Sequence, residues 1–122
     1  MKDMKDKNSG KILNVASIAG FMPGPLMATY YATKNYSLKL TMAIYEELRQ
    51  MKSNVKISAL CPGPVDTGFN KRANVKFNLK SLNAQYVARY AIDKMFKNKL
   101  LISPGFTMKL TRFFVRFIPN KL

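Results

Sequence analysis

The sequence has few of the features that mark secreted, disulfide-bonded or membrane-spanning proteins. Among its 122 residues there is one cysteine, Cys61, which excludes an internal disulfide and fits a reducing compartment. Cys61 lies in an apolar run typical of a strand, so we expect a buried structural thiol. No apolar run reaches the ~20 residues that span a bilayer, and the charged beginning, MKDMKDKNSG, does not look like a signal peptide. We therefore expect a cytoplasmic protein.

The chain also lacks internal repeats, low-complexity tracts and any segment with the composition of a linker. Hydrophobic residues make up 48% of it, which is enough for one small core. We expect residues 1–122 to belong to a single domain.

Acidic residues are scarce in this chain. Six Asp and Glu stand against 21 Lys and Arg, which gives a formal net charge of +15. Nucleic-acid binding is disfavoured, because the basic residues are spread over every segment rather than clustered on one recognition element. An acidic substrate or carrier, an anionic membrane surface and a general enrichment in lysine remain as explanations of the charge.

Short apolar runs predict three buried strands, at 11–17, 55–61 and 100–103. Between these runs the apolar residues take the spacing of amphipathic helices, at 30–51 and 81–97. Strands that alternate with helices predict an α/β fold with a parallel sheet.

The predicted strands and helices are joined by loops that contain glycine and proline. Segment 18–28 is expected to be a loop, in which Phe21, Met22, Leu26 and Met27 are candidates for an apolar pocket wall. Segment 62–68 begins with Pro62-Gly63 and is expected to be a turn at the carboxyl end of a strand. Segment 69–80 is predicted to form an irregular basic lid.

Each of the two long predicted helices has an apolar face that we expect to be buried. In 30–51 this face consists of Leu40, Ala43, Ile44, Leu48 and Met51. In 81–97 it consists of Val87, Ala88, Ala91, Ile92, Met95 and Phe96. Either Ser81 or Asn83 is expected to cap the second helix.

The tail, 106–118, is predicted to be a basic amphipathic helix. One side carries Leu110, Phe113, Phe114 and Phe117, and the other carries Lys109, Arg112 and Arg116. Such a helix can lie on an anionic membrane surface, which would make the protein membrane-associated. It can also cap an apolar pocket or pack on the sheet, and we favour packing.

A serine, a tyrosine and a lysine are spaced so that they can act together. Ser17 closes the first predicted strand, and Tyr30 and Lys34 open the helix that follows. Residues four apart share one face of a helix, so the Lys34 ammonium would favour the ionised phenol and lower the pKa of Tyr30. With the Ser17 hydroxyl holding a carbonyl or alcohol oxygen beside the phenol, the set suits proton transfer to or from that oxygen.

The Tyr-x-x-x-Lys spacing recurs at Tyr90 and Lys94, where no serine-ended strand precedes it. We interpret that second pair as two solvated helix positions. The first pair stands in a richer context, with NVASIAG before it, YYATK at the pair and CPGPVDTG after the next strand. Together these motifs resemble the short-chain dehydrogenase/reductase family, from Gly10 to the end of the chain.

The resemblance implies a Rossmann-like sheet, NAD or NADP, and hydride exchange with a ketone or secondary alcohol on a small apolar substrate, such as a 3-oxoacyl thioester or a steroid-like molecule. It implies that Tyr30 is the general acid/base, that Ser17 orients the substrate oxygen and that Lys34 acts on Tyr30 and the nicotinamide ribose. The implied cofactor contacts are Tyr30, Lys34, Pro62, Gly63, Val65 and Thr67. A homodimer or homotetramer is also implied, and no metal site is expected.

The family's Thr-Gly-x-x-x-Gly-x-Gly loop, its Asn-Asn-Ala-Gly strand and its catalytic asparagine have no counterpart in these 122 residues. We therefore expect the C-terminal part of a doubly wound Rossmann-like domain, with three strands and alternating helices and without the N-terminal dinucleotide-binding half. The choice between NAD and NADP stays open, because the residue that reads the ribose follows the family's second strand. The alternative function is a non-catalytic fragment that acts at a membrane surface or as an interaction module.

Overall fold

The computed structural model describes residues 1–72 and 80–117. Its main sheet contains three parallel strands in the order β1 (Lys11–Val15), β2 (Lys56–Leu60) and β5 (Leu101–Ile102). All three fall inside the strands that the apolar runs predict. The predicted parallel α/β sheet is confirmed.

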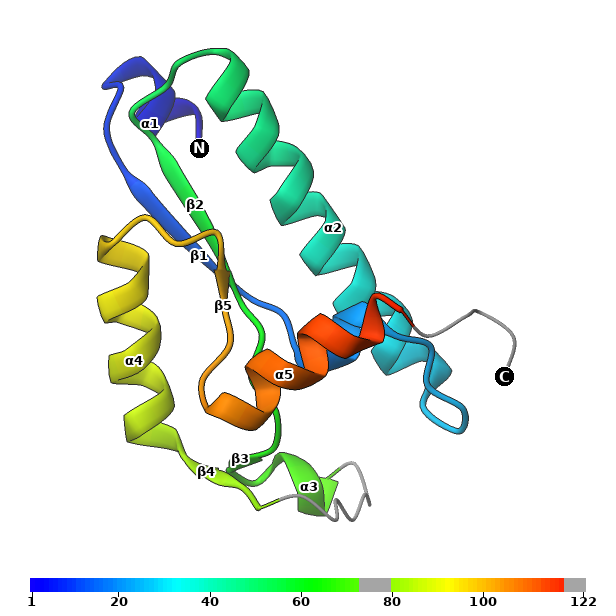
Figure 1. Cartoon of the computed structure of the whole chain (residues 1–122). Helices are drawn as coiled ribbons and strands as arrows, with labels where there is room; N and C mark the ends of the chain where they lie inside the picture. Colours follow the sequence, from blue (N-terminus) through cyan, green and yellow to red (C-terminus); the bar gives the residue numbers. More distant parts are fainter. Residues whose placement is uncertain (73–79, 118–122) are drawn as a thin grey trace.

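Helices cover both faces of the sheet, so the molecule has three layers (Figure 1). The long helix α2 (Ala28–Gln50) packs on one face, and α4 (Ala84–Phe96) packs on the other. The remaining elements are α1 (Lys2–Asp6), the 3-10 helix η1 (Ile18–Phe21), β3 (Val65–Asp66), α3 (Phe69–Arg72), β4 (Leu82–Asn83) and α5 (Phe106–Val115).

The core lies between the sheet and each helical layer. Towards α2, Ala59 and Cys61 pack with Leu38, and Ile57 packs with Leu48. Towards α4, Leu60 packs with Val87, Ala91 and Ile102. Alternate residues of β2 therefore enter opposite cores, which explains why its sequence after Lys56 is apolar apart from Ser58.

The predicted buried face of α2 is wrong in part. Leu40 and Met51 are 41% and 52% exposed, whereas Thr41 is completely buried. The Thr41 hydroxyl accepts a hydrogen bond from Asn14 Nδ2 at 2.9 Å and donates to Ser37 O at 2.8 Å. A threonine whose hydroxyl makes both hydrogen bonds can occupy a core position. A pattern based on apolar residues alone does not detect such a residue.

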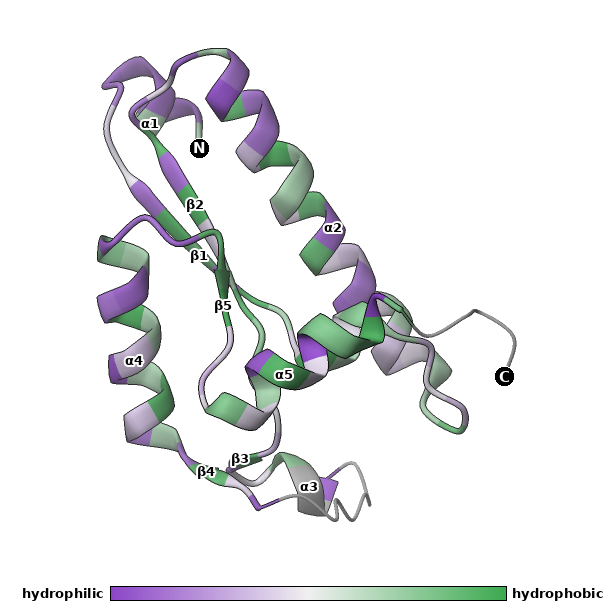
Figure 2. Ribbon diagram, in the orientation of Figure 1, coloured by the Kyte–Doolittle hydropathy of each residue, from purple (hydrophilic) through white to green (hydrophobic). Residues whose placement is uncertain are grey.

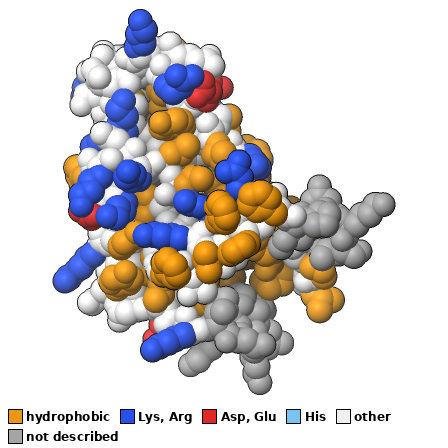
Figure 3. Space-filling model, in the orientation of Figure 1, with side chains coloured by type: hydrophobic (Ala, Val, Ile, Leu, Met, Phe, Trp, Pro, Cys, Tyr) orange, Lys and Arg blue, Asp and Glu red, His pale blue; other side chains and the backbone are white. Residues whose placement is uncertain are grey.

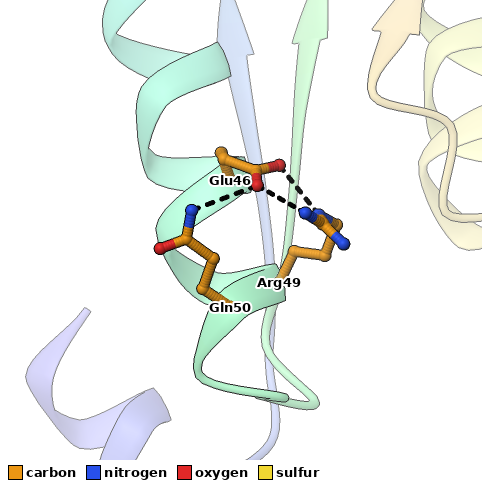
Figure 4. A network of polar contacts seen from close by, with 3 residues as sticks. All are labelled: Glu46, Arg49 and Gln50. Carbon is orange, nitrogen blue, oxygen red and sulfur yellow. Dashed lines mark hydrogen bonds and ion pairs between the residues drawn. The ribbon is translucent and has the colours of Figure 1, made fainter.

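The end of α2 carries an exposed polar network (Figure 4). Arg49 donates to both carboxylate oxygens of Glu46, at 2.8 and 2.6 Å, and Gln50 donates to one of them at 3.2 Å. The hydrogen bonds from Arg49, followed by those from Gln50, lower the pKa of Glu46 to about 2. These contacts occupy the solvent side of the helix and leave its other side for the sheet.

The predicted buried face of α4 is also wrong in part. Val87 and Ala91 are buried, but Ile92 and Phe96 are 49% and 63% exposed. The helix is short and touches only a narrow sheet, so half of its apolar residues have no surface to pack on within the described part of the chain.

Two features around the sheet were not expected from the sequence. Strands β3 and β4 form a separate two-stranded parallel pair, with Val65 opposite Leu82. The predicted lid, 69–80, begins with the helical turn α3. Its residues 73–79, with Lys76, lie outside the described residues, as does Ile118. Within residues 1–72 and 80–117, no helix is long and apolar enough to cross a bilayer.

Candidate active site

A cavity of about 470 Å³ lies at the carboxyl ends of β1 and β2. Four segments enclose it: the end of β1 with η1, the start of α2, the turn after β2, and α5. Most of its lining is apolar. Ser17, Tyr30 and Lys34 all reach this cavity, so the structure brings together the three residues that the sequence singles out for catalysis.

Ser17 reaches the cavity because the chain leaves β1 in an extended conformation and then turns into η1. The Ser17 hydroxyl accepts a hydrogen bond from the Ala19 amide at 3.1 Å, which fixes the side chain, and it keeps its own proton for donation. The residue is 7% exposed. A substrate oxygen in the cavity would find this hydroxyl already oriented.

Tyr30 and Lys34 project from the first turns of α2. Lys34 Nζ donates to the Val15 carbonyl at the end of β1, at 3.1 Å, and lies 5.8 Å from the centre of the Tyr30 ring. An ammonium group has three N–H donors, so after this contact two remain for a ligand. The positive charge and the phenol therefore occupy the same wall of the cavity.

The close approach of η1 to α2 depends on Gly20. A Cβ atom at Gly20 would lie 2.8 Å from the Lys34 carbonyl oxygen and 3.2 Å from the Leu38 side chain. Only glycine leaves room for the backbone that carries Ser17 to pack against the turn that carries Lys34.

Asn35 holds the same two segments together, and sequence reasoning missed it. Its Nδ2 donates to the carbonyl oxygens of Ala19 and Met22, at 3.4 and 3.3 Å, and to Tyr31 O at 3.4 Å. An asparagine in a helix gives no signal of such a role, because its partners are backbone atoms of a loop 13 and 16 residues away.

The turn after β2 carries four of the residues that the family resemblance implies as cofactor contacts. Pro62, Gly63, Val65 and Thr67 all line the cavity. Thr67 Oγ1 accepts a hydrogen bond from the Phe69 amide at 3.3 Å, so it stabilises its own turn and keeps a proton to donate.

The apolar wall differs from the predicted one. Of the four candidates in segment 18–28, Met22 lines the cavity. Phe21 packs on the core, Leu26 is fully exposed, and Met27 is partly buried outside the cavity lining. The wall is completed by residues that the sequence did not indicate. The Phe69 ring lies 5.3 Å from the Tyr30 ring, centre to centre.

Helix α5 closes the cavity with Met108 and Thr111. A Cβ atom at Gly63 would collide with the Met108 side chain, so this glycine lets α5 settle on the turn after β2. The tail helix therefore does cap the pocket, and its inward side is the one that carries Met108 rather than the phenylalanine side.

The second Tyr-x-x-x-Lys pair is elsewhere. Lys94 Nζ lies 5.2 Å from the centre of the Tyr90 ring on α4, and neither residue lines the cavity. Within the part of the chain that the structure describes, no group of three acidic, cysteine or histidine side chains is placed to hold a metal ion.

Comparison with known proteins adds to this geometry. A sequence model described as short chain dehydrogenase matches residues 1–77. The rat (Rattus norvegicus) protein 17-beta-hydroxysteroid dehydrogenase 13 is 30% identical over 123 residues, which cover 100% of this chain and 41% of that protein. The chain thus spans less than half the length of this curated relative.

Solved structures share the fold. A short chain dehydrogenase from Burkholderia cenocepacia in complex with NADP matches with a TM-score of 0.77 at 21% identity, over 94% of this chain and 46% of that one. A short chain dehydrogenase/reductase from Burkholderia phymatum in complex with NAD matches with a TM-score of 0.72 at 23% identity, over 97% of this chain and 54% of that one. With motifs, fold and sequence match in agreement, this chain belongs to the short-chain dehydrogenase family.

Proposed function

We propose that the protein carrying this chain is an NAD(P)-dependent oxidoreductase that exchanges a hydride with a ketone or secondary alcohol on an apolar substrate. The observation that carries the proposal is the meeting of Ser17, Tyr30 and Lys34 in one largely apolar cavity. The relative named as a hydroxysteroid dehydrogenase supports it.

In this proposal Tyr30 is the general acid/base. Its hydroxyl gives a proton to the carbonyl oxygen in reduction and takes it back in oxidation. Ser17 donates its free proton to the same oxygen and holds it beside the phenol. Lys34 places a positive charge on this wall, where it stabilises negative charge on the phenol oxygen during transfer.

The residues present fit the nicotinamide end of a dinucleotide. Lys34 keeps two N–H donors for ribose hydroxyls, and Thr67 keeps a hydroxyl proton beside the backbone of Gly63 and Val65. A bound nicotinamide would supply or accept the hydride. Solved structures of this fold contain NADP in one case and NAD in another, so both cofactors stay open.

The substrate class follows from the cavity lining. A volume of about 470 Å³ falls in the range of drug-sized ligand sites, roughly 300–1,000 Å³. Its lining is mostly apolar and includes the Ser17 hydroxyl, the Tyr30 phenol and the Lys34 ammonium. This pattern favours a hydrophobic skeleton with one oxygen function, and a steroid-like alcohol is the form that the relative's name supports.

The test is Tyr30→Phe in the full-length protein that carries this chain. Turnover of a steroid ketone with NADH or NADPH should fall by about a hundredfold or more, because general acid/base catalysis is lost, while cofactor binding by fluorescence is retained. Lys34→Ala should lower both turnover and cofactor binding. Tyr31→Phe is the matched control, because Tyr31 lines the same cavity and should keep its hydride transfer. Unchanged kcat in Tyr30→Phe would overturn the assignment and make Tyr31 the next residue to test.

The homodimer or homotetramer implied by the family stays a prediction. Tyr36 and Leu40 on α2 are 68% and 41% exposed, which supports an interface on this helix. Sedimentation of the full-length protein measures the oligomeric state directly.

A further inference from the structure

Helix α5 has apolar side chains on two opposite sides. Inward, Met108 is 6% exposed and lines the cavity. On the other side the exposed fractions are 79% for Phe106, 44% for Leu110, 57% for Phe113, 56% for Phe114 and 70% for Phe117, just after the helix. We call these five residues the outer face of α5. A surface helix of a soluble protein normally exposes polar side chains at such positions.

The outer face is continuous. At about 100° per residue, its four members within α5 fall inside an arc of about 100°, centred opposite Met108. The aromatic rings also touch one another, with Phe113 5.6 Å from Phe114 and 5.4 Å from Phe117 between ring centres. Figures 2 and 3 show hydrophobic residues along α5 and hydrophobic side chains gathered on this side of the molecule.

The inner side of α5 is fixed, so the outer face cannot be buried by rotating the helix. Arg112 Nη1 donates to Leu101 O at 3.5 Å and to Ser103 Oγ at 3.4 Å, which ties α5 to β5 and the segment after it. Met108 is seated against Gly63. The outer face therefore projects away from the core in the folded protein.

The segment that carries the outer face has charges of one sign. From Phe106 to Leu122 the sequence contains four Lys and Arg and no acidic residue. Lys109 and Arg116 are exposed beside the apolar arc. Long basic side chains at the border of an apolar face can reach phosphate groups while the aromatic rings enter the acyl region.

We propose that the outer face of α5 docks on a lipid surface that contains anionic headgroups. Its apolar arc matches the interfacial layer, and its basic border matches the negative surface potential of such lipids. A second copy of the chain fits this face less well, because Lys109 and Arg116 lie beside it and a self-association there would bring like charges together. At ten residues, α5 is too short to span a bilayer, so it lies on the surface.

Docking through the outer face would leave the cavity close to the lipid. Met108 and Thr111 line the cavity from the opposite side of the same helix, so about one helix diameter, ~10 Å, separates the pocket from the bilayer. This consequence rests on the proposed function: an apolar substrate dissolved in the lipid would have a short path to Tyr30.

Vesicle flotation tests the docking without cofactor or substrate. At low salt, the full-length protein that carries this chain should bind vesicles of phosphatidylcholine with phosphatidylserine more strongly than vesicles of phosphatidylcholine alone. High salt should remove much of this difference in binding. Phe113→Asp should weaken binding by about tenfold or more, because an aromatic side chain that enters the lipid is replaced by a charge. Phe96→Asp is the matched control: Phe96 is 63% exposed on α4, and its replacement should leave vesicle binding unchanged.

A charge reversal separates the two contributions. Lys109→Glu with Arg116→Glu should reduce binding to anionic vesicles by about 25-fold or more and have little effect on neutral ones, as each basic residue near a charged surface contributes about a factor of five. Lys39→Glu, an exposed lysine on α2, is the control and should change binding little. Circular dichroism confirms that the variants fold, which is expected because the altered side chains are exposed.

Three results would overturn the docking proposal. They are absence of vesicle binding at low salt, equal binding by Phe113→Asp, and a dimer in sedimentation that Phe113→Asp dissociates, which would make a second copy the occupant. Hydride transfer to a soluble ketone is measured without vesicles, so a failure of docking is distinguishable from a failure of the proposed activity.

Discussion

Gly20 is a position where the absence of a side chain shapes the candidate site. Replacing it with alanine would push a Cβ against the Lys34 carbonyl, a backbone atom that cannot move without shifting α2. We expect Gly20→Ala to lower the free energy of unfolding by about 1–3 kcal/mol, the usual cost of overpacking, and to reduce activity by moving Ser17 away from Tyr30.

Urea denaturation of Gly20→Ala and of Gly68→Ala measures this effect. A Cβ at Gly68 meets nothing within 4 Å, so the second variant is a control that changes glycine content without changing packing. Equal stability of the two variants would show that η1 can move away from α2 at no cost.

Cys61 is the other residue with a clear expectation. It is fully buried, as the sequence predicts, and burial raises the pKa of its thiol from 9.0 to about 12, with a smaller opposite effect of Arg112. The thiolate is the reactive form, so a thiol reagent at neutral pH should label the folded protein far more slowly than the urea-unfolded protein. Because the folded pKa is the higher one, this group favours the folded state below pH 9.0 and loses that contribution as pH rises towards about 12. Rapid labelling of folded protein would contradict the buried position.

At the level of whole elements, the start of α4 is set by a cap. Asn83 Oδ1 accepts hydrogen bonds from the amides of Gln85 and Tyr86, at 3.0 and 3.1 Å, which resolves the choice between Ser81 and Asn83. Asn83→Ala should lower the free energy of unfolding by about 1 kcal/mol. Ser81→Ala should change it by less than about 0.5 kcal/mol. Thermal denaturation of both variants checks the difference, and a larger effect at Ser81 would reverse the assignment.

The elements also show what hydrophobic periodicity can and cannot predict. In the tail it identifies the amphipathic helix and its phenylalanine side correctly. It does not tell which side packs inward, because that depends on distant contacts: Met108 is seated beside Gly63, and Arg112 bonds to the end of β5 and the segment after it. In α4 the same pattern places Ile92 and Phe96 in the core, whereas the structure exposes both.

For the molecule as a whole, the unpartnered edge of the sheet has a consequence for stability. Within the described residues β1 pairs only with β2, and Val15 at its end is 60% exposed. The backbone N–H and C=O groups on an open strand edge hydrogen-bond to water or to another chain. The 122-residue chain assayed by itself should therefore melt broadly and weakly cooperatively.

The same isolated chain should show no saturable change in NADH or NADPH fluorescence, because its proposed contacts serve only the nicotinamide end and its sequence has no glycine-rich loop for the pyrophosphate. Calorimetry and a fluorescence titration test the two expectations. A sharp melt together with micromolar dinucleotide binding would show that this part of the fold holds more of the site than its motifs indicate.

The sequence by itself determined the order and type of the main elements and the Ser17, Tyr30 and Lys34 set. These depend on the spacing of residues close together in the chain, because helix and strand periodicity and turn chemistry are local properties. The roles of the three residues stay predictions, as does the single-domain assignment.

Only the tertiary structure decided which distant residues meet. Phe69 beside Tyr30, Met108 over Gly63 and the Asn35 bonds to the serine loop join segments far apart in sequence. The exposure of the outer face of α5 was likewise decided by the tertiary structure. Burial is set by what packs against a side chain in space, and the local pattern of a helix carries no information about the shape of the surface that receives it.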